Sequence, residues 1–358
     1  MIRYAPLAIA LLGIGLLVRA QLKPDNPSGD ASGTYTDHLR HMGEALILTD
    51  QGLAVYRRPY GEWIGAQGLD EIHTGLFPER TAPYPPLGML AHWPWARLDR
   101  AGLLAPSTAH RAVVWMWTGL ALAACAVVIR LFAPLSKTAQ AWAILLAIPL
   151  LIGIGVNGFL DAGYLFCGAL GCLAWKREQR VWAVWCLALA AALHFRAAVF
   201  APLAAVVLYE LRHSTRNLAW ILPSLALVIP TAVAAFALAG TLETIPPHNP
   251  VHFSHLKLPL ALFTGLTAVT GLWLWRKDEP LVAATVLAAF ALAVLERSHG
   301  WWHAGTLLAP GLVLAARPPK AGAHWPVLGA WTVASSYLAY RHPGSVFWTW
   351  VPLGWGGL

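Results

Sequence analysis

Four residues with acid–base side chains stand at helical spacing near the start of the chain. They are Asp37, His38, His41 and Glu44, in the stretch YTDHLRHMGEALILTDQGLAVYRRPYGEW. Asp37, His41 and Glu44 recur at i, i+4 and i+7, which is one face of a helix. A carboxylate held at a dry interface can take a proton from a hydroxyl group, because desolvation raises its pKa toward the working pH. The spacing predicts either such a site or, more commonly, a solvated polar face.

The helix that carries these residues is expected to lie along a membrane surface. Thr36 is a suitable N-cap for a helix that begins at Asp37. Leu39, Met42 and Leu46 alternate with the polar residues and make the segment amphipathic. Amphipathic helices of this kind bury their apolar face in the membrane interface.

Composition identifies the surrounding elements as membrane helices. Of 358 residues, 58% are hydrophobic and 12% are charged, whereas soluble domains carry about 25% charged residues. Apolar runs recur along the whole length, and the polar alternation of membrane strands is missing. We therefore expect an all-α polytopic membrane protein, folded as a single membrane domain over residues 1–358.

The apolar runs predict about 11 membrane spans. The run after Arg3 is either a signal peptide or a first helix, and we interpret it as a retained anchor. The segment 84–98 is short and proline-rich, which favours an interfacial or re-entrant helix. Two crossings fit tightly into 181–211, with a tip at His194–Arg196. The predicted spans are 4–20, 110–130, 139–156, 159–175, 181–194, 197–211, 218–239, 257–275, 280–295, 302–316 and 325–340.

Charge orients these spans. With the N-terminus inside, the inner loops collect Lys and Arg in excess over acidic residues, as cytoplasmic loops do. The net charge of +8 is then an orientation signal, and no nucleic-acid partner is needed to explain it. The segments that face outward are the first loop at 21–109, the turns at 157–161 and 296–302, the loop at 240–256 and the tail at 341–358. The four cysteines, Cys125, Cys167, Cys172 and Cys186, lie inside apolar runs without disulfide or metal spacing.

Several outer motifs, in their order, resemble a family. An Asp after the first span is followed by Gly52, Tyr56 and Pro59 in the pattern G-x-x-x-Y-x-x-P, and then by YPPLG at 84–88. NGFLDAGYLF at 157–166, LHFRAAVFAPL at 193–203 and ERSHGWWHAGTLLAP at 296–310 complete the set. Together they resemble the polyprenol-phosphate-dependent membrane glycosyltransferases of the GT-C fold, mannosyltransferases among them. This resemblance implies a GT-C-like bundle whose long first outer loop carries interfacial helices.

The resemblance also implies an activity. The chain would transfer a sugar, with inversion, from a polyprenyl-phosphate donor to a hydroxyl of a lipid, glycan or protein acceptor. The active site would face the periplasm or exterior of a bacterial inner (plasma) membrane, among membrane lipids. The resemblance implies Asp37 as general base; since no second acid adjoins it, a divalent cation stays open, and no metal ligand is assigned.

Further site residues follow from the chemistry of this reaction. The phosphate that is left behind needs cations, and Arg suits bidentate phosphate contact. The expected donor-phosphate-binding residues are Arg58, Arg196, Arg297 and His299. The expected substrate-binding residues are His38, His41, Tyr84, Asp161 and His303.

Several of these assignments have a structural alternative. Arg196 and Arg297 can extend to lipid headgroups. Asp161 can be a buried cap for its turn. His299 and His303 can hold phosphate, ligate a metal, or belong to an aromatic belt at the interface.

Two other functions remain to be weighed. The 14 histidines and 19 tryptophans suit a membrane protein that handles haem or a metal through outer His and Trp residues, although no c-type haem attachment motif occurs. A transporter with a midplane site is disfavoured, because the predicted mid-span stretches hold almost no charges.

Overall fold

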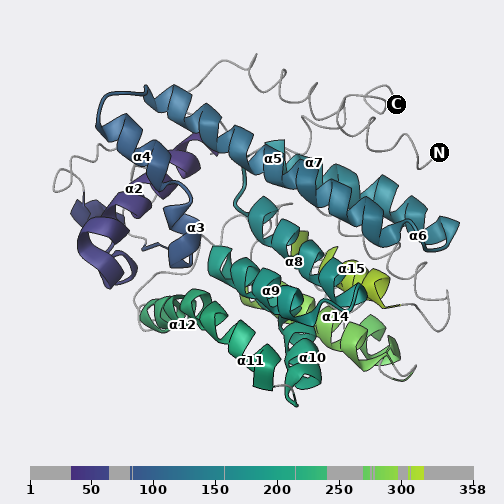
Figure 1. Ribbon diagram of the computed structural model, residues 1–358. Helices are drawn as coiled ribbons and strands as arrows, with labels where there is room; N and C mark the ends of the chain where they lie inside the picture. The colour runs from purple at the N-terminus through teal and green to yellow at the C-terminus, as the bar shows by residue number, and fades with distance from the viewer. Residues whose placement is uncertain are drawn as a thin grey trace, which may run out of the picture.

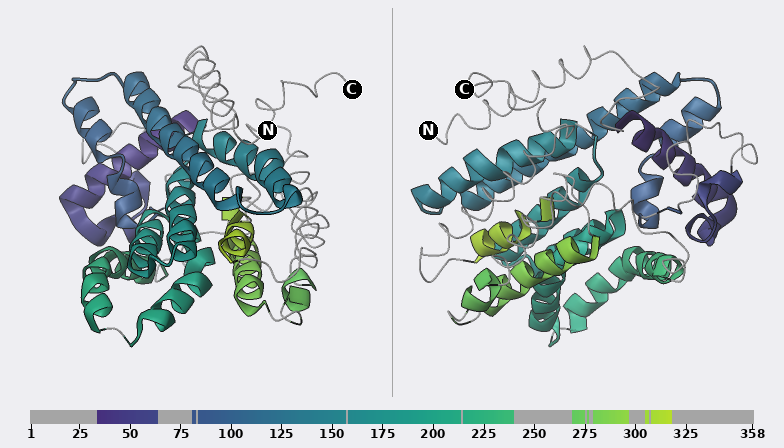
Figure 2. Two further views of the ribbon diagram at one scale, coloured as in Figure 1. Left: turned by 45° about the vertical axis from the view of Figure 1, so that its right-hand side comes forward. Right: turned by 180° about the vertical axis from the view of Figure 1, so that it is seen from behind.

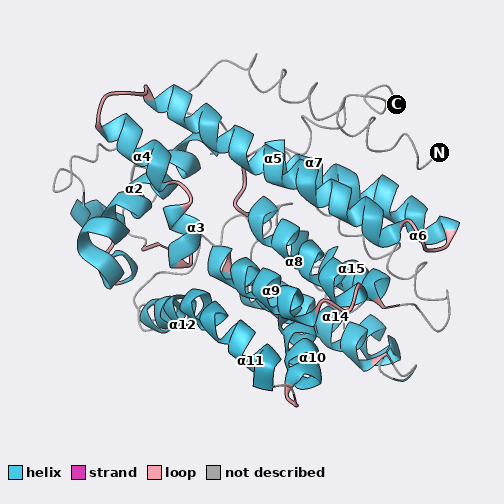
Figure 3. Ribbon diagram, in the orientation of Figure 1, coloured by secondary structure: helices cyan, strands magenta, loops and turns pink. Residues whose placement is uncertain are grey.

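The computed structural model is helical throughout the part of the chain that it describes (Figures 1 and 3). The described residues are 34–63, 81–82, 84–156, 158–213, 215–239, 269–274, 276, 279–296, 305–306 and 308–317. No strand occurs among them, which confirms the all-α prediction for this part. The predicted spans 4–20 and 325–340, most of 257–275 and the tail 341–358 lie outside the described residues.

The longest helix organises the bundle. Helix α5 (Pro106–Phe132) begins with proline at its first position, where the missing N–H costs nothing. It contacts α7 and α8, α8 contacts α9, and α15 contacts both α14 and α8. The bundle helices are α5, α6 (Lys137–Trp142), α7 (Ile148–Val156), α8 (Asp161–Lys176), α9 (Arg180–Leu193), α10 (Ala201–Leu211), α11 (Thr215–Ile221), α12 (Leu225–Ala239), α14 (Pro280–Glu296) and α15 (Leu308–Ala316).

Two helices within the described residues are long and apolar enough to cross a membrane. They are α5, of 27 residues, and the 25-residue stretch Thr215–Ala239 that joins α11 to α12. Only 22% of the apolar window of the second stretch is buried, and Trp220 and Phe236 are 64% and 81% exposed. The core helix of a soluble protein would be mostly buried, so these helices are a weak indication of membrane association. The predicted number of about 11 spans stays a prediction.

The structure places chain breaks where the sequence predicted them. Helix α9 ends at Leu193, and His194 is extended, with φ −154° and ψ 136°. A 3₁₀ segment over Phe195–Phe200 then leads into α10, so 181–211 is not one long helix. The segment 84–98 forms two short helices, α3 (Pro86–Leu90) and α4 (Trp93–Arg100), and neither is long enough to span a bilayer.

Within the described residues, the helices of the first predicted outer loop and the end of α8 lie at opposite ends of the bundle. At one end the first-loop helices lie beside the start of α5 and the end of α9 (Figures 1 and 2). At the other end Lys176, the last residue of α8, donates hydrogen bonds to the carbonyl oxygens of Leu131 and Ala315, both at 2.9 Å. A 27-residue helix such as α5 is about 40 Å long, and this length separates the two ends.

The helix with the acid–base residues, α2 (Thr34–Gln51), differs from its prediction. It begins at Thr34, two residues before the expected cap, so Thr36 lies inside it. It is also buried on both faces from His38 to Ile47, because α3, α4, α5 and the 3₁₀ segment Gly52–Tyr56 pack around it. The prediction of a solvated polar face is therefore wrong for this part of α2, and its position along a membrane surface stays a prediction.

The first loop has a small apolar core of its own. Leu39, Met42, Leu46 and Ile47 of α2 form one cluster with residues from the rest of the loop, including Val55, Tyr56 and Met89. The larger core lies in the bundle and includes Cys125, Cys167 and Cys172. All four cysteines are free thiols; Cys125, Cys167 and Cys172 are buried, and Cys186 is partly buried.

Candidate functional site

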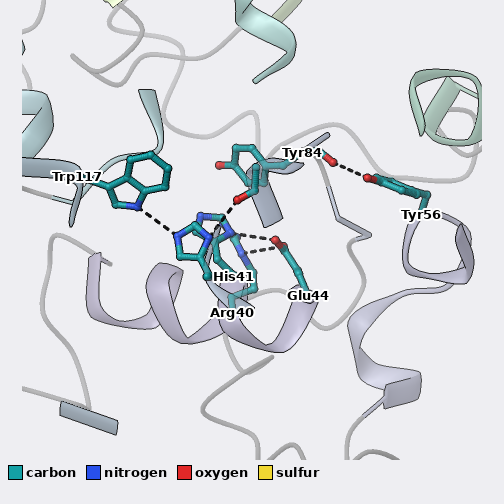
Figure 4. A network of polar contacts seen from close by, with 8 residues as sticks. Arg40, His41, Glu44, Tyr56, Tyr84 and Trp117 are labelled. Carbon is teal, nitrogen blue, oxygen red and sulfur yellow. Dashed lines mark hydrogen bonds and ion pairs between the residues drawn. The ribbon is translucent and has the colours of Figure 1, made fainter. Parts of the chain in front are cut away.

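A carboxylate and an imidazole of α2 form a buried pair (Figure 4). Nδ1 of His41 lies 2.9 Å from Oε2 of Glu44. The other oxygen of Glu44 faces Nε of Arg40 at 3.5 Å. His41 is 6% exposed and Glu44 1%. An ionised carboxylate only accepts hydrogen bonds, so Nδ1 of His41 carries a proton and donates it to Glu44.

A second imidazole packs against this pair. The rings of His92 and His41 are 5.0 Å apart. Nε2 of His92 accepts a hydrogen bond from Nε1 of Trp117 at 3.3 Å, and Nδ1 donates to the carbonyl of Gly88 at 3.1 Å. This pattern fixes the neutral form of the ring. Burial, with the nearby His41 as a further cause, lowers the pKa of His92 to about 3.

A third imidazole joins α2 to the turn before α8. His38 Nε2 donates to the carbonyl of Gly158 at 2.8 Å, and its Nδ1 lies 2.8 Å from Nδ1 of His110. Burial, followed by the neighbours His110, His92 and His41, lowers the pKa of His38 well below its ordinary value. Gly158 has φ +70°, and a Cβ there would overlap the imidazole of His38. The NGFLD turn therefore requires glycine at this position for two separate reasons.

Tyr84 connects α2 with the tip between α9 and α10. Its ring stands edge-on to His41 at 4.6 Å and edge-on to His194 at 5.3 Å. Its carbonyl accepts a hydrogen bond from the hydroxyl of Tyr56 at 2.7 Å. Burial, with a smaller effect from the charge of Glu44, raises the pKa of Tyr56, which keeps this hydroxyl a donor.

A buried ion pair stands at the start of α8. Nη1 of Arg196 donates to Oδ1 of Asp161 at 2.7 Å, and Arg196 is only 8% exposed. The side chain of His194 caps the 3₁₀ segment by accepting the backbone N–H of Arg196 at 3.0 Å. Its Nε2 lies 3.9 Å from Asp161. Arg196 therefore does not extend to headgroups, and Asp161 binds this arginine across 35 positions of sequence.

These contacts form one continuous set, which we call the α2–α8 polar network. It runs from Glu44 through His41, Tyr84, His194 and Asp161 to Arg196. Four of the expected site residues, His41, Tyr84, Asp161 and Arg196, belong to it. His38 lies beside it, next to His92 and His41.

The remaining expected residues fall elsewhere. Arg58 is exposed, and its guanidinium lies 5.7 Å from the ring of Trp63, because the chain turns outward after Tyr56. It is therefore not part of the network. Asp37 lies on α2, but its side chain is outside what the structure describes. Arg297, His299 and His303 also lie outside the described residues.

Three histidines of the site escaped prediction. His194 stands in the motif LHFR, and its spacing of two from Arg196 was the one available signal. His92 and His110 come from a proline-rich segment and a helix start, and no spacing connects them to His41 or His38. Only the tertiary fold brings them together.

The described residues do not form a metal centre. No three His, Cys, Asp or Glu side chains among them lie where they could hold a metal ion. The ring nitrogens of His38 and His92 are already engaged by protein groups. Comparison with protein-family models, with curated proteins and with solved structures found no match.

Proposed function

We propose that this chain is an inverting glycosyltransferase of the outer membrane face. It takes a sugar from a polyprenyl-phosphate donor and transfers it to an acceptor hydroxyl, within a multi-pass GT-C-like bundle of about 11 spans in a bacterial plasma membrane. One observation carries the proposal: the acid–base residues of α2 and the buried Asp161–Arg196 pair meet at one end of the bundle. Transfer from a lipid phosphate needs these two kinds of group at one place.

The arginine supplies the electrostatic part of this chemistry. Asp161 and the local helix hold Arg196 in one orientation. A guanidinium carries five N–H donors in a planar fork, which suits the oxygens of a phosphate. Positive charge that is already in place stabilises the phosphate as it departs, without reorganisation during the reaction.

The acceptor hydroxyl needs a base on the face of the anomeric carbon opposite the leaving phosphate. Helix α2 provides the candidates, and Asp37 is the residue that the resemblance implies. Direct displacement at the anomeric carbon then inverts its configuration. The leaving polyprenyl phosphate stays in the membrane, and the glycosylated lipid, glycan or protein departs from the outer face.

The test is a turnover assay of purified protein in lipid with a panel of radiolabelled polyprenyl-phosphate sugars and added acceptor extracts. Wild type is compared with Arg196→Gln and Asp37→Asn. Asp50→Asn is the matched control, because Asp50 stands on the same helix in a surface ion pair with Arg100 at 3.2 Å. Consumption of a donor by wild type and by the control, with a loss of about 100-fold or more in Arg196→Gln, supports the proposal. Failure of folded wild type to consume any donor overturns it.

A further inference from the structure

The imidazoles of the site differ in what their second ring nitrogen does. Both ring nitrogens of His38 and of His92 are engaged by protein groups. In His194, Nδ1 accepts a backbone N–H and Nε2 faces Asp161. His41 alone of these four gives Nδ1 to a carboxylate and has no hydrogen bond to Nε2 within the described residues. No described protein group therefore engages its basic nitrogen, Nε2.

Glu44 orients His41 so that Nε2 carries the lone pair. It sets the tautomer, because Nδ1–H of His41 donates to Oε2 and the lone pair is left on Nε2. Arg40 beside the other oxygen favours the ionised form of the carboxylate. A buried negative charge next to Nδ1 also stabilises the imidazolium that forms when Nε2 takes up a proton.

The other groups around His41 come from the segment before α3, from the start of α4, from α5 and from α2 itself. Tyr84 presents its ring edge, and neutral His92 lies between His41 and Trp117 of α5. His38 precedes it on α2, and burial followed by its neighbour His110 lowers the pKa of His38 and keeps it neutral. The charged groups that the structure places around His41 are thus Glu44 and Arg40 of its own helix. Both histidine neighbours, His38 and His92, have lowered pKa values and are neutral.

We infer that His41 and Glu44 form a general-base dyad, in which Nε2 of His41 receives the proton of the acceptor hydroxyl. The inference rests on the proposed transfer reaction and names a different base from Asp37, which stands four residues earlier on the same helix. As the acceptor oxygen bonds to the anomeric carbon, the bond from that carbon to the phosphate oxygen breaks. The electron pair leaves on the phosphate, the proton goes to Nε2, and the imidazolium later releases it to water.

The experiment measures the pH dependence of kcat/KM for donor consumption. Wild type is compared with His41→Gln, Glu44→Gln and Asp37→Asn, and His92→Gln is the control for a buried histidine in contact with His41. His41→Ala is assayed with and without added imidazole. We expect His41→Gln to lose 10²- to 10⁴-fold and to lack the acid limb of the profile. Glu44→Gln should lose about 10- to 100-fold, with its acid limb moved to lower pH. Added imidazole should restore part of the activity of His41→Ala.

The results separate the two proposals. If the wild-type protein turns over no donor, both the proposed transfer reaction and the role of the dyad in it are overturned. Active wild type with an unchanged acid limb in His41→Gln overturns the dyad alone, and an acid limb lost only in Asp37→Asn assigns the base to Asp37. His92→Gln should lower stability without moving the limb; if it moves the limb as far as Glu44→Gln does, the effect is structural and the dyad is overturned.

Discussion

The neutral histidine packed between His41 and Trp117 makes stability depend on pH in a way that can be measured. His92 has a pKa of about 3 in the folded chain because it is buried, against about 6.5 when unfolded. As the pH falls below about 6.5, His92 binds a proton in the unfolded state but not in the folded state. The free energy of unfolding therefore falls with pH over the window from about 6.5 down to about 3. At pH 5 the loss from this one residue is about 2 kcal/mol.

The substitution His92→Gln isolates this contribution. Glutamine can donate to the carbonyl of Gly88 and accept from Trp117 as His92 does, and it does not titrate. The free energy of unfolding is measured in detergent by denaturant titration with tryptophan fluorescence, at pH 7.5 and pH 5, for both proteins. Wild type should lose about 2 kcal/mol more than the variant between the two pH values. Equal losses would refute the reasoning. His38 titrates in both proteins, and burial and His110, the two largest causes of its lowered pKa, are present in both, so most of its effect cancels.

Further predictions concern the turn, the ion pair and the exposed arginine. Gly158→Ala should lower the free energy of unfolding by about 2 kcal/mol or more, since alanine at positive φ is strained and its methyl group displaces His38. Denaturant titration measures this change, and a change of less than about 0.5 kcal/mol would contradict the prediction. Arg196→Gln should cost about 3–5 kcal/mol because it leaves Asp161 buried and unpaired, and adding Asp161→Asn should recover part of that loss; a double variant no more stable than the single one would refute the pairing. Arg58→Gln should change the free energy of unfolding by less than about 0.5 kcal/mol, since Arg58 is exposed. A larger loss in the same denaturant titration would show that its side chain is buried.

Helix positions were accessible from the sequence because apolar runs and breakers are local signals. The expected span 110–130 falls inside α5, and the expected break at His194 is present. The segment 84–98 was expected as one short interfacial or re-entrant helix and forms two short helices. The start of α2 was expected at Asp37 and lies three residues earlier, at Thr34, since a cap preference at Thr36 is weak against continued helical backbone.

The environment of α2 was not accessible, for a physical reason. Amphipathic spacing shows that two faces differ, but it does not show what covers the polar one. In the fold the polar face meets other polar groups, namely the carbonyl of Gly158, His92 and Tyr84, so it is buried with partners instead of solvated. Contacts between residues far apart in sequence decide this, and no local pattern records them.

The two hydrogen bonds of Lys176 become possible at different times during synthesis. Its ammonium bonds the carbonyl of Leu131, made 45 residues earlier, and that of Ala315, made 139 residues later. At a translation rate of roughly 5–20 residues per second, the second acceptor appears about 7–30 s after the lysine itself. For that interval α5 and α8 already share a contact to which α15 has still to be added. This end of the bundle is therefore completed late, after the helices around the α2–α8 polar network have left the ribosome.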